Sequence, residues 1–226
     1  GDGDMDAFVS SNGGNQVWLN DGSGVFTLNG QSIGGRIGRD VELGDFDGDG
    51  DIDAVVLNNL GLQVFVNDGS GQFTSGGPVS GIGSGLALAT GDIDGDGDLD
   101  LAIGRNGSNE VWLNNGSGVF TNSGQALGSA DTRGIELADM DGDGDLDIVS
   151  ANRTSGDQIW LNDGSGIFTD SGQVLGSGTG FANAVGDLNG DSQSVPLISE
   201  DAAFTISADD LLANDTDIDN GHTLSV

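Results

Sequence analysis

Asp-Phe-Asp-Gly-Asp-Gly-Asp-Ile-Asp, residues 45–53, is the stretch on which the fold prediction rests. It carries an aspartate at every odd place and a glycine at its fourth and sixth places. A phrase of the same form returns at 92–100 and at 139–147, a step of 47 residues each time. Self-similarity at a fixed period of roughly 20–50 residues is typical of repeat architectures. The chain is therefore predicted to be built from repeated units.

A second phrase keeps the same register. Val-Trp-Leu-Asn at 17–20 recurs in related form at 64–67, 111–114 and 159–162, in steps of 47, 47 and 48 residues. The extra residue of the last step is placed in the turn at 152–157, because loops absorb insertions at little cost. In this register Asp2, Asp4 and Asp6 match Asp49, Asp51 and Asp53, so we expect the chain to be part of a longer one.

Each repeat reads as four short strands. An alternating strand runs into the aspartate loop, and a nearly continuous apolar run leaves it, as at 54–57 and 99–103. Such a run is expected of a strand covered on both faces. The Val-Trp-Leu phrase is the third strand, and a Gly-rich turn such as 67–71 leads to the fourth. No helical period is found, so the prediction is an all-β fold of four-stranded antiparallel β-propeller blades, an incomplete open arc of about four blades over residues 1–193.

The composition restricts the partners. Of the 226 residues 37 are acidic and 5 are basic, and all but four of the acids are aspartate, which favours turns and loops. A net charge of −32 opposes binding to nucleic acid or to an anionic membrane surface. Cysteine is absent, and no apolar run approaches the roughly 20 residues of a membrane helix. We expect neither nucleic-acid binding nor direct membrane insertion.

The loop chemistry favours calcium. Carboxylates at the first, third, fifth and ninth places can converge on one ion, because Gly48 and Gly50 let the backbone curl. The seventh residue, Asp51, is expected to offer its backbone carbonyl and to leave its side chain in water. An all-oxygen, flexible ligand set suits Ca²⁺ better than Zn²⁺ or Mg²⁺.

Other readings of the acidic loops are weaker. An EF-hand needs Glu at its twelfth place, where these loops have Val56, Ile103 and Ser150. Paired aspartates can act as the acid and base of a glycosidase, but equal repetition opposes this, because catalysis needs two unlike environments. The aromatic residues of the third strands are expected in the core rather than as sugar platforms. The only histidine, His222, lies far from the repeats, so no Ser-His-Asp set is expected there.

The aspartate loops and the strands around them resemble the FG-GAP/VCBS-type repeats of integrin-like β-propellers. The resemblance implies a complete ring of about seven blades, and a calcium loop between the first two strands of each blade. It implies metal ligands at these positions: Asp45, Asp47, Asp49, Asp51, Asp53, Asp92, Asp94, Asp96, Asp98, Asp100, Asp139, Asp141, Asp143, Asp145 and Asp147, with Asp2, Asp4 and Asp6 as a partial, weaker set. A fifth copy begins at Asp187 but has Gln193 and Val195 at the places of the last two aspartates, so its site is expected to be empty or weak.

The last stretch, 194–226, changes character. Its segments 200–206 and 210–217 resemble the opening of a bacterial cadherin-like, immunoglobulin-like adhesin repeat. This implies a second, truncated domain, with a possible further calcium set at Asp215, Asp217 and Asp219.

Together these features predict a non-enzymatic, calcium-binding interaction scaffold that is secreted or on a cell surface, part of a large adhesin, with a protein or polysaccharide as its ligand. Extracellular calcium modules bind at about 10⁻⁴–10⁻³ M, a range that calcium outside cells fills. Two alternatives stay open: an accessory or catalytic propeller of a secreted polysaccharide-degrading enzyme, and a calcium-dependent lectin.

Overall fold

The computed structural model describes residues 2–11, 13–35, 37–79, 81–186 and 188. All regular elements of these residues are β-strands, and none of them forms a helix that could span a membrane. The chain divides into two compact units, Gly1–Gly186 and Asp187–Val226. Of the second unit only Leu188 is described, so the predictions for the loop at Asp187 and for the domain at 194–226 lie outside the described residues.

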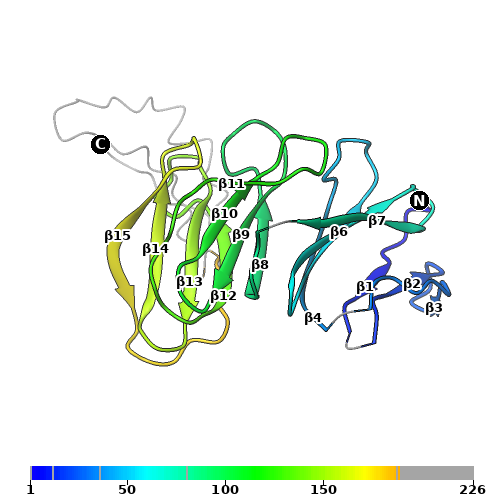
Figure 1. Ribbon diagram of the computed structural model, residues 1–226, viewed down its shortest axis with the longest axis horizontal. Helices are drawn as coiled ribbons and strands as arrows, with labels where there is room; N and C mark the ends of the chain where they lie inside the picture. Colours follow the sequence, from blue (N-terminus) through cyan, green and yellow to red (C-terminus); the bar gives the residue numbers. More distant parts are fainter. Residues whose placement is uncertain (1, 12, 36, 80, 187, 189–226) are drawn as a thin grey trace, which may run out of the picture. The chain divides into compact units, whose positions relative to one another are not determined.

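The strands form four antiparallel sheets, each built in chain order (Figure 1). The first sheet comprises β1 (Ala7–Val9), β2 (Gln16–Asn20) and β3 (Phe26–Leu28). The second comprises β4 (Gly38–Gly44), β5 (Asp53–Asn58), β6 (Gly61–Asn67) and β7 (Phe73–Val79). The third comprises β8 (Gly85–Gly91), β9 (Asp100–Arg105), β10 (Glu110–Leu113) and β11 (Thr121–Asn122). The fourth comprises β12 (Thr132–Ala138), β13 (Asp147–Asn152), β14 (Asp157–Asn162) and β15 (Phe168–Leu175).

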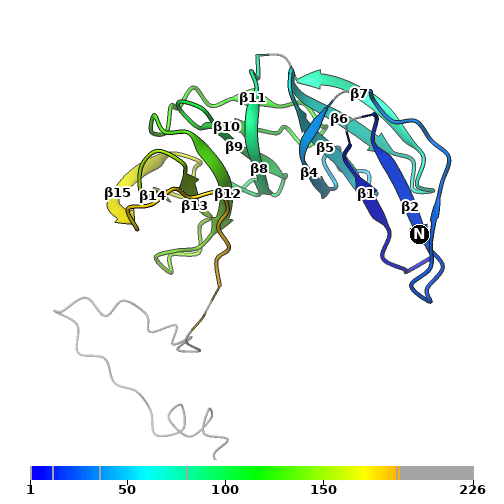
Figure 2. The ribbon, with the colours of Figure 1, turned by 90° about the horizontal axis from the view of Figure 1, so that it is seen from below.

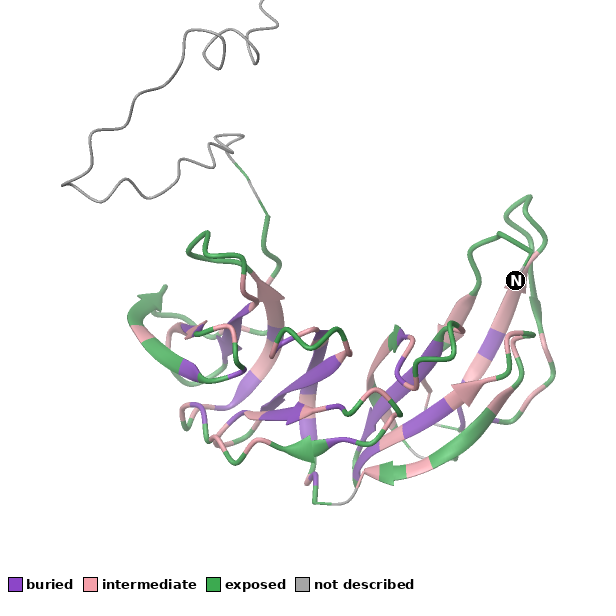
Figure 3. Cartoon of the chain, turned by 90° about the horizontal axis from the view of Figure 1, so that it is seen from above, coloured by how far each residue is buried: buried purple, intermediate pink, exposed green. Residues whose placement is uncertain are grey.

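The prediction of an all-β chain with four repeated blades is therefore confirmed. The sheets follow one another in chain order, with β4 in contact with β8 and β8 in contact with β12 (Figure 2). The strand that follows each complete loop is the buried centre of its sheet, as its apolar sequence predicts: every residue of β5 and β13 is buried. Figure 3 shows the buried residues gathered on such strands and the exposed ones mainly in the turns.

Successive residues of β5 pack into two different cores, which shows how the sheets stack. Ala54 and Val56 belong to a cluster shared with Val17 of the first sheet. Val55 and Leu57 belong to a cluster shared with the third sheet. Because side chains alternate between the faces of a strand, this sheet is covered on both sides.

The same arrangement holds at the next interface. Ala102 and Val111 of the third sheet share a cluster with Ile148 and Trp160 of the fourth. Each core thus lies between neighbouring blades rather than within one, so a blade depends on its neighbours for burial. Phe65, Trp112 and Trp160 are 2%, 5% and 8% exposed, which confirms their prediction as core residues, whereas Trp18 of the first sheet is only half-buried.

Strand pairing locates the extra residue of the last repeat. In the third sheet Ile103 pairs with Glu110, across six intervening residues. In the fourth sheet the equivalent pair is Ser150 with Gln158, across seven. The insertion therefore lies in the β13–β14 hairpin, as the sequence predicts.

Candidate metal centre

Each complete aspartate loop joins the first strand of a sheet to the second, and its ninth residue anchors it. Asp53, Asp100 and Asp147 begin β5, β9 and β13, and all three are 0% exposed. The Asp53 carboxylate accepts backbone hydrogen bonds from Phe46 at 3.2 Å and from Asn67 at 2.8 Å. It thereby ties the start of the loop to the end of β6.

The other two loops repeat this anchor. Asp100 accepts hydrogen bonds from the backbone N–H groups of Ile93 and Asn114 at 2.9 and 2.7 Å. Asp147 accepts those of Met140 and Asn162, both at 2.8 Å. The ninth carboxylate is thus held by protein donors, and each of its oxygens keeps a lone pair for a cation.

The first aspartate of the loop curls the backbone around itself. The two oxygens of Asp45 accept the N–H groups of Gly48 and Gly50 at 2.8 and 2.9 Å. These glycines have φ values of +78° and +91°, which only glycine adopts without strain. The sequence prediction of a glycine-dependent curl is borne out at these two positions.

Three sets of carboxylates converge closely enough to bind one ion each. Within a set, one oxygen from every residue lies within 4.8 Å of the others, and the sets are Asp45, Asp47 and Asp53; Asp92, Asp94 and Asp96; and Asp139, Asp141 and Asp147. The first and third places of the loop join every set, while the fifth joins one and the ninth joins two. Among the described residues, no set includes Asp2, Asp4 or Asp6, nor the seventh places Asp51, Asp98 and Asp145.

The loop at 92–100 shows most directly that a cation fits. Asp92 Oδ1 and Asp94 Oδ1 are buried, and no hydrogen bond reaches them within the described part of the chain. A buried carboxylate oxygen without a donor carries a large desolvation cost, which a cation would offset. The oxygen-only donor set is the kind that Ca²⁺ prefers.

The pKa values of the loop carboxylates have the same cause. Burial, followed by repulsion from Asp96, raises the pKa of Asp94. The pKa values of Asp47 and Asp141 are raised for the same reasons, by burial first and then by neighbouring aspartates. Burial raises the pKa of Asp100 to about 6. Without a cation, each loop holds charge that its surroundings oppose.

The expectation that the seventh side chain stands free in water holds only in part, because Asp51, Asp98 and Asp145 are half-buried. A Cβ built on Gly116 would lie 2.5 Å from Asp98 Oδ2, and one built on Gly69 would lie 2.6 Å from Asp51 Oδ2. The carboxylate is therefore packed against the Gly-rich turn between the third and fourth strands of its own sheet. The sequence signal was the glycine that recurs in every copy of that turn.

A substitution in the turn that contacts Asp98 is expected to lower both the stability of the chain and the affinity of the loop for a cation. Gly116 has a φ of +72°, and Gly124 has a φ of +81° with no atom within 4 Å of a built Cβ. Gly124→Ala should cost about 1–2 kcal/mol of unfolding free energy from backbone strain alone. Gly116→Ala should cost more and should also reduce calcium affinity, because the new methyl group displaces Asp98. Urea unfolding and calcium titration of both variants measure the difference, and equal behaviour would contradict the contact.

The loops at 45–53 and 92–100 also contact the following blade, through their second residues. Phe46 is 1% exposed and packs edge-on against Phe120, with ring centroids 5.9 Å apart. Its carbonyl accepts hydrogen bonds from Asn114 Nδ2 at 2.9 Å and from the backbone of Gly118 at 2.7 Å. The loop of the second blade is thus held by the third.

The next interface repeats this contact. The Ile93 carbonyl accepts a hydrogen bond from Asn162 Nδ2 at 2.8 Å, and Ile93 is 1% exposed. Sequence reasoning missed these asparagines, although an asparagine ends the third strand of every repeat. Two of the three candidate metal centres, those at 45–53 and 92–100, therefore lie at contacts between blades.

Comparisons with known proteins give a family and a fold. A family model described as "FG-GAP-like repeat" matches four overlapping segments, residues 1–56, 45–103, 92–150 and 139–194. No curated protein matches the chain. A solved lectin from Agrocybe aegerita, described as recognising non-reducing terminal N-acetylglucosamine, is similar with a TM-score of 0.56 and 24% identity. The match covers 74% of this chain and 48% of the lectin, so the chain spans about half of that protein.

A second solved structure is a more distant match. The Tc holotoxin pore of Photorhabdus luminescens matches with a TM-score of 0.40 and 20% identity, over 78% of this chain and 10% of the toxin.

Proposed function

The chain belongs to the family of FG-GAP-like repeats, and from this membership we propose that it is a calcium-binding β-propeller scaffold of a secreted or cell-surface protein. The observation that carries the proposal is the pair of buried, unpartnered oxygens of Asp92 and Asp94 within a convergent carboxylate set. Carboxylate sets that share the first and third aspartates of the loop recur at equal spacing in two further blades, which favours a structural role for the ion.

The proposal assigns no catalytic step to these repeats. Catalysis by two carboxylates needs one proton donor and one base in unlike environments. The loops instead repeat the same anchor at the ninth aspartate in three successive blades. We propose instead that the chain has a binding function, as part of a larger adhesin whose ligand is a protein or a polysaccharide.

The affinity expected of such loops supports a location outside the cell. Extracellular calcium modules bind at about 10⁻⁴–10⁻³ M, above cytosolic calcium and within the range of calcium outside cells. The net charge of −32 would also hinder folding in the absence of divalent cations.

Calorimetric titration of the whole chain with calcium tests the proposal. We expect about three sites of the affinity typical of extracellular modules, one for each complete loop. Asp94→Asn should remove one site, because this residue contributes a buried, unpartnered oxygen. Asp170→Asn, at an exposed acid of β15, is the matched control and should leave the stoichiometry unchanged. Absence of calcium binding in the parent chain would refute the proposal.

A further inference from the structure

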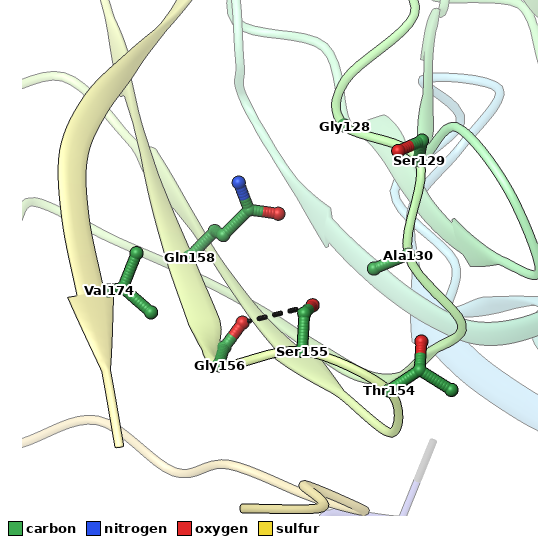
Figure 4. Close-up of a pocket in the computed structure, with 8 residues that line it drawn as sticks. All are labelled: Gly128, Ser129, Ala130, Thr154, Ser155, Gly156, Gln158 and Val174. Carbon is green, nitrogen blue, oxygen red and sulfur yellow. Dashed lines mark hydrogen bonds between the residues drawn. The ribbon is translucent and has the colours of Figure 1, made fainter. Parts of the chain in front are cut away.

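A pocket of about 310 Å³ opens beside the last described interface, away from the aspartate loops (Figure 4). One wall is the segment 128–130, which precedes β12, and the other is the β13–β14 hairpin at 154–156. Gln158 of β14 and Val174 of β15 complete the lining. Two adjacent strands and two turns of different sheets thus surround one space.

The pocket coincides with the one-residue insertion of the fourth blade. The extra residue of the fourth blade lies in the same hairpin that supplies Thr154, Ser155 and Gly156. The hairpin of the third blade is one residue shorter at the equivalent place. A departure from the repeat that produces a cavity is a place to look for a function that the other blades do not share.

The lining is polar and uncharged. Ser129, Thr154 and Ser155 offer hydroxyl groups, and Ala130 and Val174 offer apolar surface. Gln158 Oε1 accepts a hydrogen bond from Asn152 Nδ2 at 3.3 Å, while no hydrogen bond from Gln158 Nε2 occurs among the described residues. The lining therefore presents both donors and acceptors to a ligand.

The tryptophan behind this lining differs from its equivalents. Trp18 and Trp112 donate their Nε1–H to the residue two places earlier, Gln16 at 3.3 Å and Glu110 at 3.0 Å. Trp160 Nε1 is buried and has no hydrogen-bond partner in the described part of the chain, although Gln158 stands two places earlier. In the fourth blade the Gln158 side chain points toward Asn152 and the pocket instead of toward Trp160.

Gly128 joins the tryptophan to the pocket wall. A Cβ built there would lie 3.2 Å from both Gln158 Oε1 and Trp160 Cζ2. Cζ2 lies on the ring edge that carries Nε1, so a ligand that moves Gln158 changes the surroundings of this indole. Trp160 is therefore a built-in reporter of the pocket.

We propose that this pocket binds a neutral, hydroxylated ligand of the size of one sugar residue, such as the terminal unit of a glycan. A pyranose ring combines hydroxyl groups with an apolar C–H face, which matches the hydroxyls and the amide on one side and Val174 on the other. The volume lies at the lower end of the usual range for small-molecule sites, roughly 300–1,000 Å³.

Charged ligands fit less well. No charged side chain lines the pocket, and the net charge of −32 repels anions. A cation would find no carboxylate there. A flat heterocycle would need an aromatic face to stack on, and the lining has none.

Saturation-transfer NMR and tryptophan fluorescence test the inference on the whole chain in calcium buffer. The probes are galactose, glucose, mannose, fucose and N-acetylglucosamine, with glucuronic acid as the anionic comparison. In a Trp18→Phe, Trp112→Phe background the emission comes from Trp160 alone, since the chain has three tryptophans. At least one neutral sugar should give a saturable change, and glucuronic acid should bind more weakly.

Variants then assign the binding to the pocket. Gln158→Ala should weaken it about tenfold, the effect of one lost hydrogen bond. Thr154→Ala, at an exposed position, should weaken it without affecting folding. Gln63→Ala is the matched control, since Gln63 occupies the same place in the second blade and donates to Ser75 at 3.1 Å. No saturable binding of any neutral sugar, or equal binding by the Gln158→Ala and parent chains, would overturn the inference.

The site does not use the aspartate loops. If the chain binds a sugar but the calorimetric titration detects no calcium binding, the inference stands and the proposed calcium scaffold is rejected. Calcium binding without sugar binding would do the reverse.

Discussion

Removal of calcium is expected to lower the thermal unfolding midpoint of the chain by more than any single substitution. A site filled at 100 times its dissociation constant adds about 2.7 kcal/mol, so three sites add about 8 kcal/mol. For a chain of this size, each kcal/mol shifts the midpoint by about 2–4 °C. Scanning calorimetry in saturating calcium and in chelator should therefore show a loss on the order of 15 °C or more.

The ion and the loops can be separated by controls. Magnesium at equal concentration should restore little of the loss, because it requires near-octahedral geometry and keeps several of its waters. Asp141→Asn should reduce the gap between the calcium and chelator midpoints by about a third, while Asp170→Asn should leave it unchanged. A calcium-independent midpoint in the parent chain would contradict the expected coupling.

Asn162→Ala is expected to have the second largest effect on stability, because it removes a hydrogen bond between the fourth blade and the loop of the third. Asn162 is 6% exposed, and its amide donates to the carbonyls of Ile93 and Leu146 at 2.8 and 3.1 Å. A buried carbonyl left without its donor costs about 1–3 kcal/mol. Both carbonyls would be left without this donor, so we expect the free energy of unfolding measured in urea to fall by about 3–4 kcal/mol.

Asn67→Ala is its matched control. Asn67 occupies the same place in the second blade and donates to Ile52 at 3.0 Å within its own sheet. Its Oδ1 accepts the Gly71 N–H at 3.1 Å, as that of Asn162 accepts the Gly166 N–H at 3.0 Å. The difference between the two variants therefore isolates the bond to Ile93 and the deeper burial. Asn162→Ala should also weaken calcium binding by the loop at 92–100, and equal effects of both variants would contradict the inter-blade contact.

The blades could be predicted because their signals are local and repeated. The period of the aspartate phrase and of the Val-Trp-Leu phrase gives the repeat, and the apolar runs at 54–57 and 99–103 give strands buried on both faces. Pairing in the β13–β14 hairpin then confirms the position of the inserted residue. These features depend on neighbours in sequence or on the two-residue period of a strand.

The contacts between blades could not be predicted in the same way. That Asn162 reaches the Ile93 carbonyl depends on how two sheets stack, which no local pattern encodes. The position of the Asp98 side chain depends on the turn at Gly116, which belongs to another hairpin of the same sheet. The orientation of Gln158 depends on a hairpin longer by one residue. In each case the decisive partner is distant in sequence or set by an irregularity.

The two contacts between a loop and the following blade have the same direction along the chain. Asn114 donates to the loop of the second blade and Asn162 to that of the third, so in both contacts the support comes from the C-terminal neighbour. Each of these two loops therefore depends on the blade that follows it in the chain. Loosening one of these blades should accordingly weaken cation binding by the loop before it and leave the loop after it unchanged.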